Sequence, residues 1–299
     1  MIGLAGFVGV EASLRFGAAF GRAWFALGLP RTRRVLEQLD AAFPDRTAAE
    51  REGWAREVFE HLGQGLSELI LLSGRHRAFI LDRVEVEGLE HLERAQAEAG
   101  GMGAVVIGPH LGNWELAAAK LAELGVSVSG VYRDARQPAL QRAILRVRSA
   151  TAPVLSEKSD PIQYIAMGRL AGVQFVRALK SGRSVLALLD QHARAGEGLL
   201  VPFFGRPAST RFGPLKLADR AGSPVLLAFA RRRPDRRRHV LTIHPALQLA
   251  PGASEDEEVL RQNLERVTAE LEAEIRTSPG QWIWTHRRWR EPAQSDAAD

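Results

Sequence analysis

From residue 84 onward, short apolar runs alternate with segments whose apolar residues recur every three or four positions. The runs predict strands at 84–88, 104–108, 126–132, 184–190, 224–230 and 239–244. The periodic segments predict helices at 89–98, 114–124, 138–148, 161–181, 213–221 and 255–276, the last with Ser254 as its N-cap. Such alternation is typical of a sheet with helices on both faces, so the sequence predicts an α/β fold.

Residues 31–81 carry helical patterns only. We expect one helix at Arg33–Ala42, ending before a Phe-Pro pair, and a longer one at Ala48–Leu81. Thr47 precedes the longer helix, and Glu50 lies three residues further on, which is the pattern of a capping box. A helical layer therefore precedes the α/β part.

The first thirty residues are apolar and rich in Gly and Ala, but Glu11, Arg15 and Arg22 interrupt them. The charge-free runs are too short to span a bilayer. Arg15 and Arg22 are seven residues apart and so share a helix face, and aromatic and Leu side chains fill the other positions. We predict a membrane-associated N-terminal helix at residues 1–30; the alternative is an amphipathic helix packed on the protein's own core.

Composition narrows the chemistry. The chain of 299 residues has no Cys, which excludes disulfides, thiolate catalysis and cysteine–zinc sites. Its net charge of +5 favours an anionic membrane surface, an acidic carrier protein or nucleic acid as partner. Six Arg lie in the predicted hairpin loop at 231–238, without aromatic neighbours or a nucleic-acid motif, so we expect no nucleic acid. Phosphate-binding loops, dinucleotide fingerprints, a serine nucleophile elbow and metal-site His spacing are also missing from the sequence.

The octet Gly108-Pro109-His110-Leu111-Gly112-Asn113-Trp114-Glu115 joins a predicted strand to a predicted helix. It puts His110 at the carboxyl end of a strand, where α/β sheets usually bind ligands, and makes Asn113 the expected N-cap. Because the turn interrupts the helix, Glu115 can approach His110, and an imidazole beside a carboxylate can act as a general base. The alternative is a capped turn with a solvated His and Glu.

Other polar or aromatic residues stand where strands end. Arg133 follows one predicted strand and could bind an anion near His110, or lie on the surface. Asp190 and Gln191 follow another, at the expected site position, unless Asp190 is only a turn residue. Phe203 and Phe204 lie between Pro and Gly in a segment that suits neither helix nor strand; they could line an acyl groove or pack on the core. The Trp- and Arg-rich segment 279–289 suits either a membrane interface or an aromatic plug on the core.

Taken in order, these motifs resemble the bacterial lipid A biosynthesis acyltransferase family, the lauroyl and myristoyl transferases within the lysophospholipid acyltransferase superfamily. The resemblance runs nearly end to end. It rests on Leu39–Pro44, Val86–Glu90, His110–Glu115, Val131–Arg133, Asp190-Gln191, Pro202–Gly205, Ala208–Thr210 and Gln281–Trp284. This chain has Gln38-Leu39 where the family usually has Asn-Leu, and its apolar N-terminal segment is shorter than is common there.

The resemblance implies a mixed central sheet flanked by helices, in an acyltransferase domain at 31–291 followed by a disordered tail at 292–299. It implies transfer of a fatty acyl group from an acyl carrier protein or CoA thioester to a glycolipid hydroxyl, at the cytoplasmic face of the cell inner membrane. No cofactor or metal is implied. The acceptor expected is a lipid A precursor. The alternatives are another glycolipid or glycerolipid, such as a phosphatidylinositol mannoside or lysophospholipid, a lipid hydrolase, or a catalytically silent membrane-binding module.

Residue roles follow from the same resemblance. His110 would take the hydroxyl proton, and Glu115 would orient the imidazole and stabilise its charged form. Arg133 would hold phosphate or developing negative charge. Asp190 would bind the acceptor sugar or support Arg133. The remaining residues expected to bind substrate are Asn113, Gln191, Phe203 and Phe204.

Overall fold

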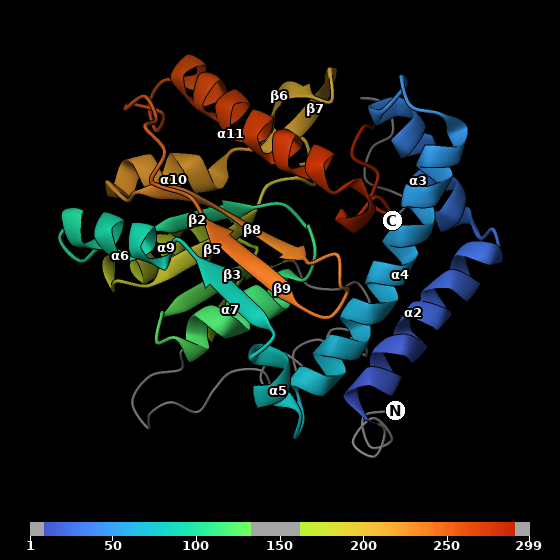
Figure 1. Cartoon of the computed structure of the whole chain (residues 1–299). Helices are drawn as coiled ribbons and strands as arrows, with labels where there is room; N and C mark the ends of the chain where they lie inside the picture. The colour runs from blue at the N-terminus through green and yellow to red at the C-terminus, as the bar shows by residue number, and fades with distance from the viewer. Residues whose placement is uncertain (1–8, 133–161, 291–299) are drawn as a thin grey trace.

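The computed structural model describes residues 9–132 and 162–290. Its centre is a seven-stranded sheet in the order β1-β9-β8-β2-β5-β3-β4. All neighbouring strands are parallel except β8 and β9, so the sheet is mixed, as expected (Figure 1). The strands are β1 (Val84–Glu87), β2 (Val105–Gly108), β3 (Val128–Tyr132), β4 (Ile162–Ala166), β5 (Ser184–Leu188), β8 (Val225–Arg232) and β9 (His239–Ile243).

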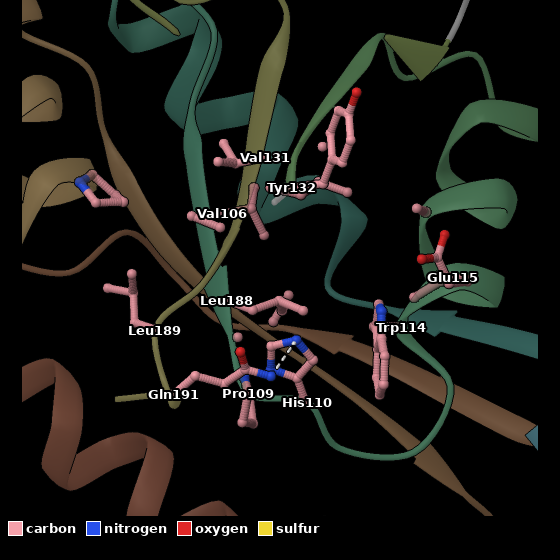
Figure 2. A pocket seen from close by; sticks show the side chains of 18 of the residues that line it. Val106, Pro109, His110, Trp114, Glu115, Val131, Tyr132, Leu188, Leu189 and Gln191 are labelled. Carbon is pink, nitrogen blue, oxygen red and sulfur yellow. Dashed lines mark hydrogen bonds between the residues drawn. The ribbon is translucent and has the colours of Figure 1, made fainter. Parts of the chain in front are cut away.

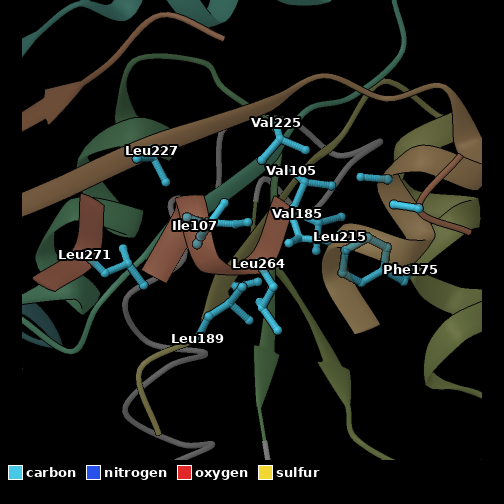
Figure 3. Packing of buried hydrophobic residues seen from close by; sticks show 14 of the residues in the cluster. Val105, Ile107, Phe175, Val185, Leu189, Leu215, Val225, Leu227, Leu264 and Leu271 are labelled. Atoms are coloured by element: carbon cyan, nitrogen blue, oxygen red, sulfur yellow. The ribbon is translucent and has the colours of Figure 1, made fainter. Parts of the chain in front are cut away.

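Helices cover both faces of this sheet. Because side chains alternate along a strand, Val105 and Ile107 of β2 face one layer and Val106 faces the other. Val105 and Ile107 pack with residues of α9 (Ala171–Lys180), α10 (Gly213–Ala221) and α11 (Glu257–Thr277), as Figure 3 shows. Val106 packs with residues of α6 (Leu89–Glu98) and α7 (Trp114–Glu123). The sheet is therefore buried on both sides, as the apolar runs predicted.

The N-terminal layer contains α2 (Val10–Ala26), α3 (Pro30–Ala42), α4 (Ala48–Leu72) and α5 (Arg77–Leu81). The capping box is confirmed: the Thr47 hydroxyl accepts from the Glu50 N–H, and the Thr47 N–H donates to the Glu50 carboxylate at 2.8 Å. The predicted helix at Ala48–Leu81 was too long. It ends at Leu72 and the chain turns through Gly74 before α5 begins.

Glycines let α2 lie directly against α4 (Figure 1). A Cβ added at Gly21 would meet the Phe59 carbonyl oxygen at 2.0 Å, and one at Gly17 would meet that of Gly63 at 2.4 Å. Leu14 is buried in this contact, while Phe16 on the far side of α2 is 72% exposed. Within residues 9–132 and 162–290, no helix has both the length and the apolar character to cross a bilayer.

Two further predicted segments differ from the structure in their type of secondary structure. The helix expected at 161–181 is strand β4 followed by α9, because Ile162 and its neighbours pair with β3 at the edge of the sheet. The segment judged unsuited to a strand forms the hairpin of β6 (Gly198–Phe203) and β7 (Arg206–Arg211). Its turn places both Phe204 and Gly205 at positive φ, as two-residue hairpin turns require. The cap of α11 is Asp256 and not Ser254. The predicted helix 138–148, Arg133 and the tail 292–299 lie outside the described residues.

Candidate active site

The site is built at the carboxyl ends of two neighbouring parallel strands. Gly108 of β2 lies opposite Leu188 of β5 in the register of the sheet. His110 and Asp190 each follow two residues after these partners, so the register brings the two side chains to the same point. This is the edge of an α/β sheet at which ligands usually bind.

Asp190 holds His110 through two hydrogen bonds. The His110 ring Nδ1 lies 2.7 Å from Asp190 Oδ1, and the His110 backbone N–H donates to Oδ2 at 2.6 Å. Because a carboxylate only accepts hydrogen bonds, the proton of the neutral ring resides on Nδ1. Nε2 then carries the lone pair that a general base needs, and the side-chain amide of Gln191 lies 3.3 Å from it (Figure 2).

Asp190 is a buried carboxylate with a third donor. Its residue is 1% exposed, and the indole N–H of Trp282 donates to Oδ2 at 2.5 Å. Burial alone raises the pKa of the Asp190 carboxyl. The charge of His110 and the hydrogen bonds from the His110 ring, the His110 backbone and Trp282 outweigh burial and lower that pKa below its usual value. Asp190 therefore stays ionised and orients the imidazole.

The C-terminal segment also fixes the backbone of the turn that carries His110. The Ile283 N–H donates to the His110 carbonyl at 3.1 Å, and the Gly112 N–H donates to the Gln281 carbonyl at 3.0 Å. Gly112 has φ +57°, and a Cβ there would meet the Ala230 carbonyl oxygen at 2.2 Å, so this turn requires glycine. Residues about 170 positions apart in the sequence thus build one hydrogen-bonded turn.

Glu115 lies in the first turn of α7, beyond Trp114 (Figure 2). The Trp114 ring stands edge-on to the His110 ring at 4.8 Å between centroids, and both Glu115 and His110 line the same cavity. The sequence predicts that Glu115 orients the His110 ring. In the structure, the carboxylate that bonds His110 Nδ1 belongs to Asp190. A catalytic role of Glu115 in the cavity stays a prediction.

The other expected substrate contacts divide into two groups. Gln191 lines the cavity beside His110. Asn113 is 6% exposed; its oxygen accepts from the Leu116 N–H as the predicted N-cap, and its amide donates to Glu68 at 2.8 Å. Both polar atoms of Asn113 thus serve the fold of the turn, and it does not appear among the described residues that line the cavity.

The expected acyl groove at Phe203 and Phe204 is not found there. Both side chains are buried in an aromatic cluster with Phe43, Trp282 and Trp284. The hairpin turn directs these rings inward, where they pack edge-on against each other at 4.9 Å. The Trp- and Arg-rich segment is likewise the plug on the core, since Trp282 and Trp284 are 2% and 0% exposed. The cluster supports Trp282 behind Asp190.

A cavity of about 400 Å³ begins at His110 and Gln191 and continues between α7 and the sheet. Its inner walls are apolar side chains of β2, β3, β5, β9 and α7, including Val106, Val128, Leu186, Leu241 and Leu121. The face of the sheet that packs α7, and not the hairpin, therefore offers an apolar space next to the His110 ring. Its volume lies within the usual range for small-molecule sites.

A buried ionic cluster lies behind the turn, which we call the Glu68 cluster: Glu68, Arg232, His239, His61 and Asn113. Arg232 donates to both Glu68 oxygens, at 2.5 and 2.8 Å, and His239 Nε2 lies 2.9 Å from Glu68. The Arg232 Nε–H donates to His61 at 3.1 Å. Burial, with the nearby charge of Arg232, lowers the pKa of His61 to about 3. The cluster joins α4 to the strand end of β8 and, through Asn113, to the start of α7.

The predicted loop arginines are mostly paired. Besides Arg232 in the Glu68 cluster, Arg231 bonds Glu274 at 3.1 Å, Arg236 bonds Glu60, and Arg238 bonds Asp235 at 2.7 Å. The β8–β9 hairpin confirms the predicted loop. These ion pairs give its charges a role within the fold.

The fold and the site together define an α/β enzyme type in which a histidine, oriented by a buried carboxylate, faces an apolar cavity. Comparison with known proteins gives the family. The model of the bacterial lipid A biosynthesis acyltransferase family matches residues 2–291, and the chain belongs to that family.

Among its relatives is the lipid A biosynthesis lauroyltransferase of Escherichia coli (strain K12), 26% identical over 279 residues that cover 92% of this chain and 84% of the relative. The lipid A biosynthesis acyltransferase of Haemophilus influenzae is 25% identical over 256 residues, covering 84% and 73%. The phosphatidylinositol mannoside acyltransferase of Mycobacterium tuberculosis (strain ATCC 25618 / H37Rv) is 29% identical over 201 residues, covering 64% and 57%. These relatives confirm the predicted acyltransferase class.

Proposed function

We propose that this acyltransferase moves a fatty acyl chain from a thioester of acyl carrier protein, or of CoA, to a hydroxyl of a lipid A precursor. The observation that carries the proposal is the His110–Asp190 pair at the mouth of the apolar cavity. The pair supplies a base for the hydroxyl, and the cavity supplies a place for the chain.

The chemistry needs no covalent enzyme intermediate. His110 Nε2 takes the proton of the acceptor hydroxyl while the hydroxyl oxygen attacks the thioester carbonyl carbon. The C–S bond of the resulting tetrahedral intermediate then breaks, and the imidazolium returns the proton to the leaving thiolate. Asp190 stabilises the imidazolium between the two steps, as the carboxylate of a catalytic triad does. Ester and free thiol are the products.

The acceptor is inferred from the relatives. The lauroyltransferase of E. coli matches 92% of this chain, whereas the phosphatidylinositol mannoside acyltransferase matches 64% at slightly higher identity. The breadth of the first match favours a lipid A precursor. The higher sequence identity of the phosphatidylinositol mannoside acyltransferase makes a mannosylated phospholipid the competing acceptor.

We further propose that the enzyme works at the cytoplasmic face of the cell inner membrane. Support comes from exposed apolar side chains of α2, of its C-cap Leu27 and of α4, which we call the α2 patch: Phe16, Phe20, Leu27, Leu62 and Leu66. Phe16 and Leu27 are 72% and 71% exposed. Arg15 is exposed on the same helix, where it can meet anionic headgroups, whereas Arg22 pairs with Glu60 at 3.6 Å.

One assay tests the function. Purified enzyme is given radiolabelled lauroyl–acyl carrier protein with either an underacylated lipid A precursor or a phosphatidylinositol mannoside, and the lipids are analysed by mass spectrometry. We expect a new acyl ester on the lipid A precursor and little free fatty acid. Ester formed only on the mannoside would replace the acceptor. Free fatty acid as the sole product would make the protein a hydrolase, and membrane binding without turnover would make it a silent module.

A further inference from the structure

A second and larger cavity, about 1140 Å³, adjoins the one at His110. The two share lining residues, among them Gln191, Arg194 and Arg211. We call the larger cavity the vestibule. A molecule that reaches His110 can therefore extend into the vestibule without crossing a wall.

The vestibule is lined by arginines from three parts of the chain. Arg31 and Arg34 come from the first turns of α3, Arg194 and Arg211 come from the segments around the β6–β7 hairpin, and Arg290 comes from the C-terminal segment. Among the described lining residues the one acidic side chain is Glu197, which pairs with Arg211 at 2.9 Å. The walls therefore carry a marked excess of positive charge.

Arg31 and Arg34 are placed by helix geometry. Side chains three residues apart share a helix face, so both reach the vestibule from α3, whereas Arg33 is not among the residues that line it. Arg34 donates to the Thr285 carbonyl at 3.4 Å, which ties it to the C-terminal segment. Across residues 9–132 and 162–290, neither Arg31, Arg34 nor Arg194 forms an ion pair with a carboxylate.

This arrangement differs from that of the other arginine-rich region. In the β8–β9 loop, Arg231, Arg236 and Arg238 are paired with carboxylates of the chain itself. In the vestibule, two arginines of α3 and one from the segment before β6 line an open space, and the part of the chain that the structure describes offers them no carboxylate partner. Guanidinium groups that line one space in this way suit a phosphate, because they can donate several directed hydrogen bonds to its oxygens.

We propose that Arg31, Arg34 and Arg194 bind a phosphate ester carried by a substrate whose reacting group lies at His110. The inference deepens the proposed function and rests on it. The source we favour is a phosphate on the membrane-bound acceptor. α3 follows α2 after only three residues, so its arginines lie close along the chain to the α2 patch and to the headgroup level of a bilayer.

The other source of the same chemistry is the phosphodiester of the thioester donor. Kinetics with matched substrates separates the two. The acceptor is used with and without its phosphate, and the donor is used either as acyl carrier protein thioester or as the phosphate-free acyl N-acetylcysteamine thioester. The variants are Arg31→Gln/Arg34→Gln together, with Arg33→Gln on the same helix as the control.

We expect the double variant to raise KM for the phosphorylated acceptor about 10- to 100-fold, with kcat nearly unchanged. KM for the dephosphorylated acceptor should not change, and Arg33→Gln should behave as the wild type. A KM increase confined to the phosphate-bearing donor would keep the phosphate site and assign it to the donor. Equal KM values in wild type and double variant for every substrate would overturn the inference.

A binding measurement keeps this test independent of turnover. Titration calorimetry with inorganic pyrophosphate should show binding to the wild type and to Arg33→Gln, and at least tenfold weaker binding to the double variant. Equal pyrophosphate affinity in wild type and double variant would overturn the site even in an active enzyme. If no glycolipid is acylated, but the double variant binds pyrophosphate more weakly than the wild type and Arg33→Gln do, the proposed function is wrong and the anion site is supported.

Discussion

Replacing Trp282 by Phe tests how much the proposed catalysis depends on a side chain that does not line the cavity at His110. Asp190 accepts side-chain hydrogen bonds from the His110 ring and from the indole N–H of Trp282. Phe retains a ring in the aromatic cluster, where Trp282 lies 5.8 Å from Phe203 and 4.4 Å from Trp284 between centroids. The substitution therefore removes one hydrogen bond to a buried carboxylate while keeping most of the packing.

The magnitude follows from the kind of bond. A hydrogen bond to a charged group contributes about 1.5–3 kcal/mol, which corresponds to about 10- to 150-fold. If that energy is used to hold Asp190 and His110 in line, kcat of Trp282→Phe should fall about 10- to 100-fold while KM changes little. The variant also loses part of a ring from a packed interior, so its melting temperature should fall by a few degrees.

Trp284→Phe is the matched control. Trp284 is 0% exposed in the same cluster, and its indole N–H donates to the Pro279 carbonyl at 2.8 Å, away from Asp190. It should lose similar thermal stability but keep its kcat. Steady-state acyl-transfer kinetics give kcat for both variants, and differential scanning calorimetry gives their melting temperatures.

The pH–rate profile gives a second readout. Trp282 helps to lower the pKa of Asp190, so its removal raises that pKa, and the carboxylate is protonated at a higher pH. The acidic limb of the profile of Trp282→Phe should therefore move to higher pH, and that of Trp284→Phe should not. Identical kcat values and profiles in the two variants would refute the positioning of Asp190 by Trp282.

Three further outcomes are expected. Glu68→Gln leaves the buried Arg232 without its carboxylate and should lower the free energy of unfolding by about 3–5 kcal/mol in denaturant titration. The exposed control Glu258→Gln should change that free energy little. Equal free energies of unfolding in the two variants would show that the Glu68 cluster is not a buried ion pair. The pKa of His61 is lowered to about 3, so as pH falls from about 6.5 toward 3 the unfolded chain binds a proton that the folded chain does not, and the folded state loses stability. In His61→Gln the melting temperature should fall less over this pH range. The same fall of melting temperature with pH in wild type and variant would contradict this. Phe16→Ser/Phe20→Ser should reduce flotation with phosphatidylglycerol vesicles, while Leu200→Ser, at an exposed residue of the β6–β7 hairpin, should not. Unchanged flotation of the double variant would remove α2 as the membrane contact.

Much of the fold is readable in the sequence, because each buried strand of the sheet centre is a continuous apolar run and each covering helix has one apolar face. The runs around Val105, Val185 and Val225 are of this kind. β4 is different. It is an edge strand with mixed burial, and Gln163 and Tyr164 within it fit a helical period as well as a strand. The hairpin at Phe204 was missed because its turn uses a non-glycine residue at positive φ.

The site was predicted less completely than the fold. His110 and Asp190 were both found from their positions at strand ends, but only the pairing of β2 with β5 shows that they meet. Sequence spacing favoured Glu115 because it is near His110 along the chain, whereas Asp190 is eighty residues away. No local signal connects Trp282 to Asp190. The order of strands in the sheet would have been the one clue, since it places the ends of β2 and β5 side by side.

The central claim is that His110 is the base and that Asp190 holds it. Its most direct test is the initial rate of acyl-ester formation by Asp190→Asn and His110→Ala, each checked for its native melting transition. An Asn amide can donate to Nδ1 and so favour the wrong tautomer of His110. Both variants should lose about 10²- to 10⁴-fold in kcat/KM. Near wild-type kcat/KM in a folded Asp190→Asn enzyme, with activity abolished in Glu115→Gln, would contradict the account and return the orienting role to Glu115.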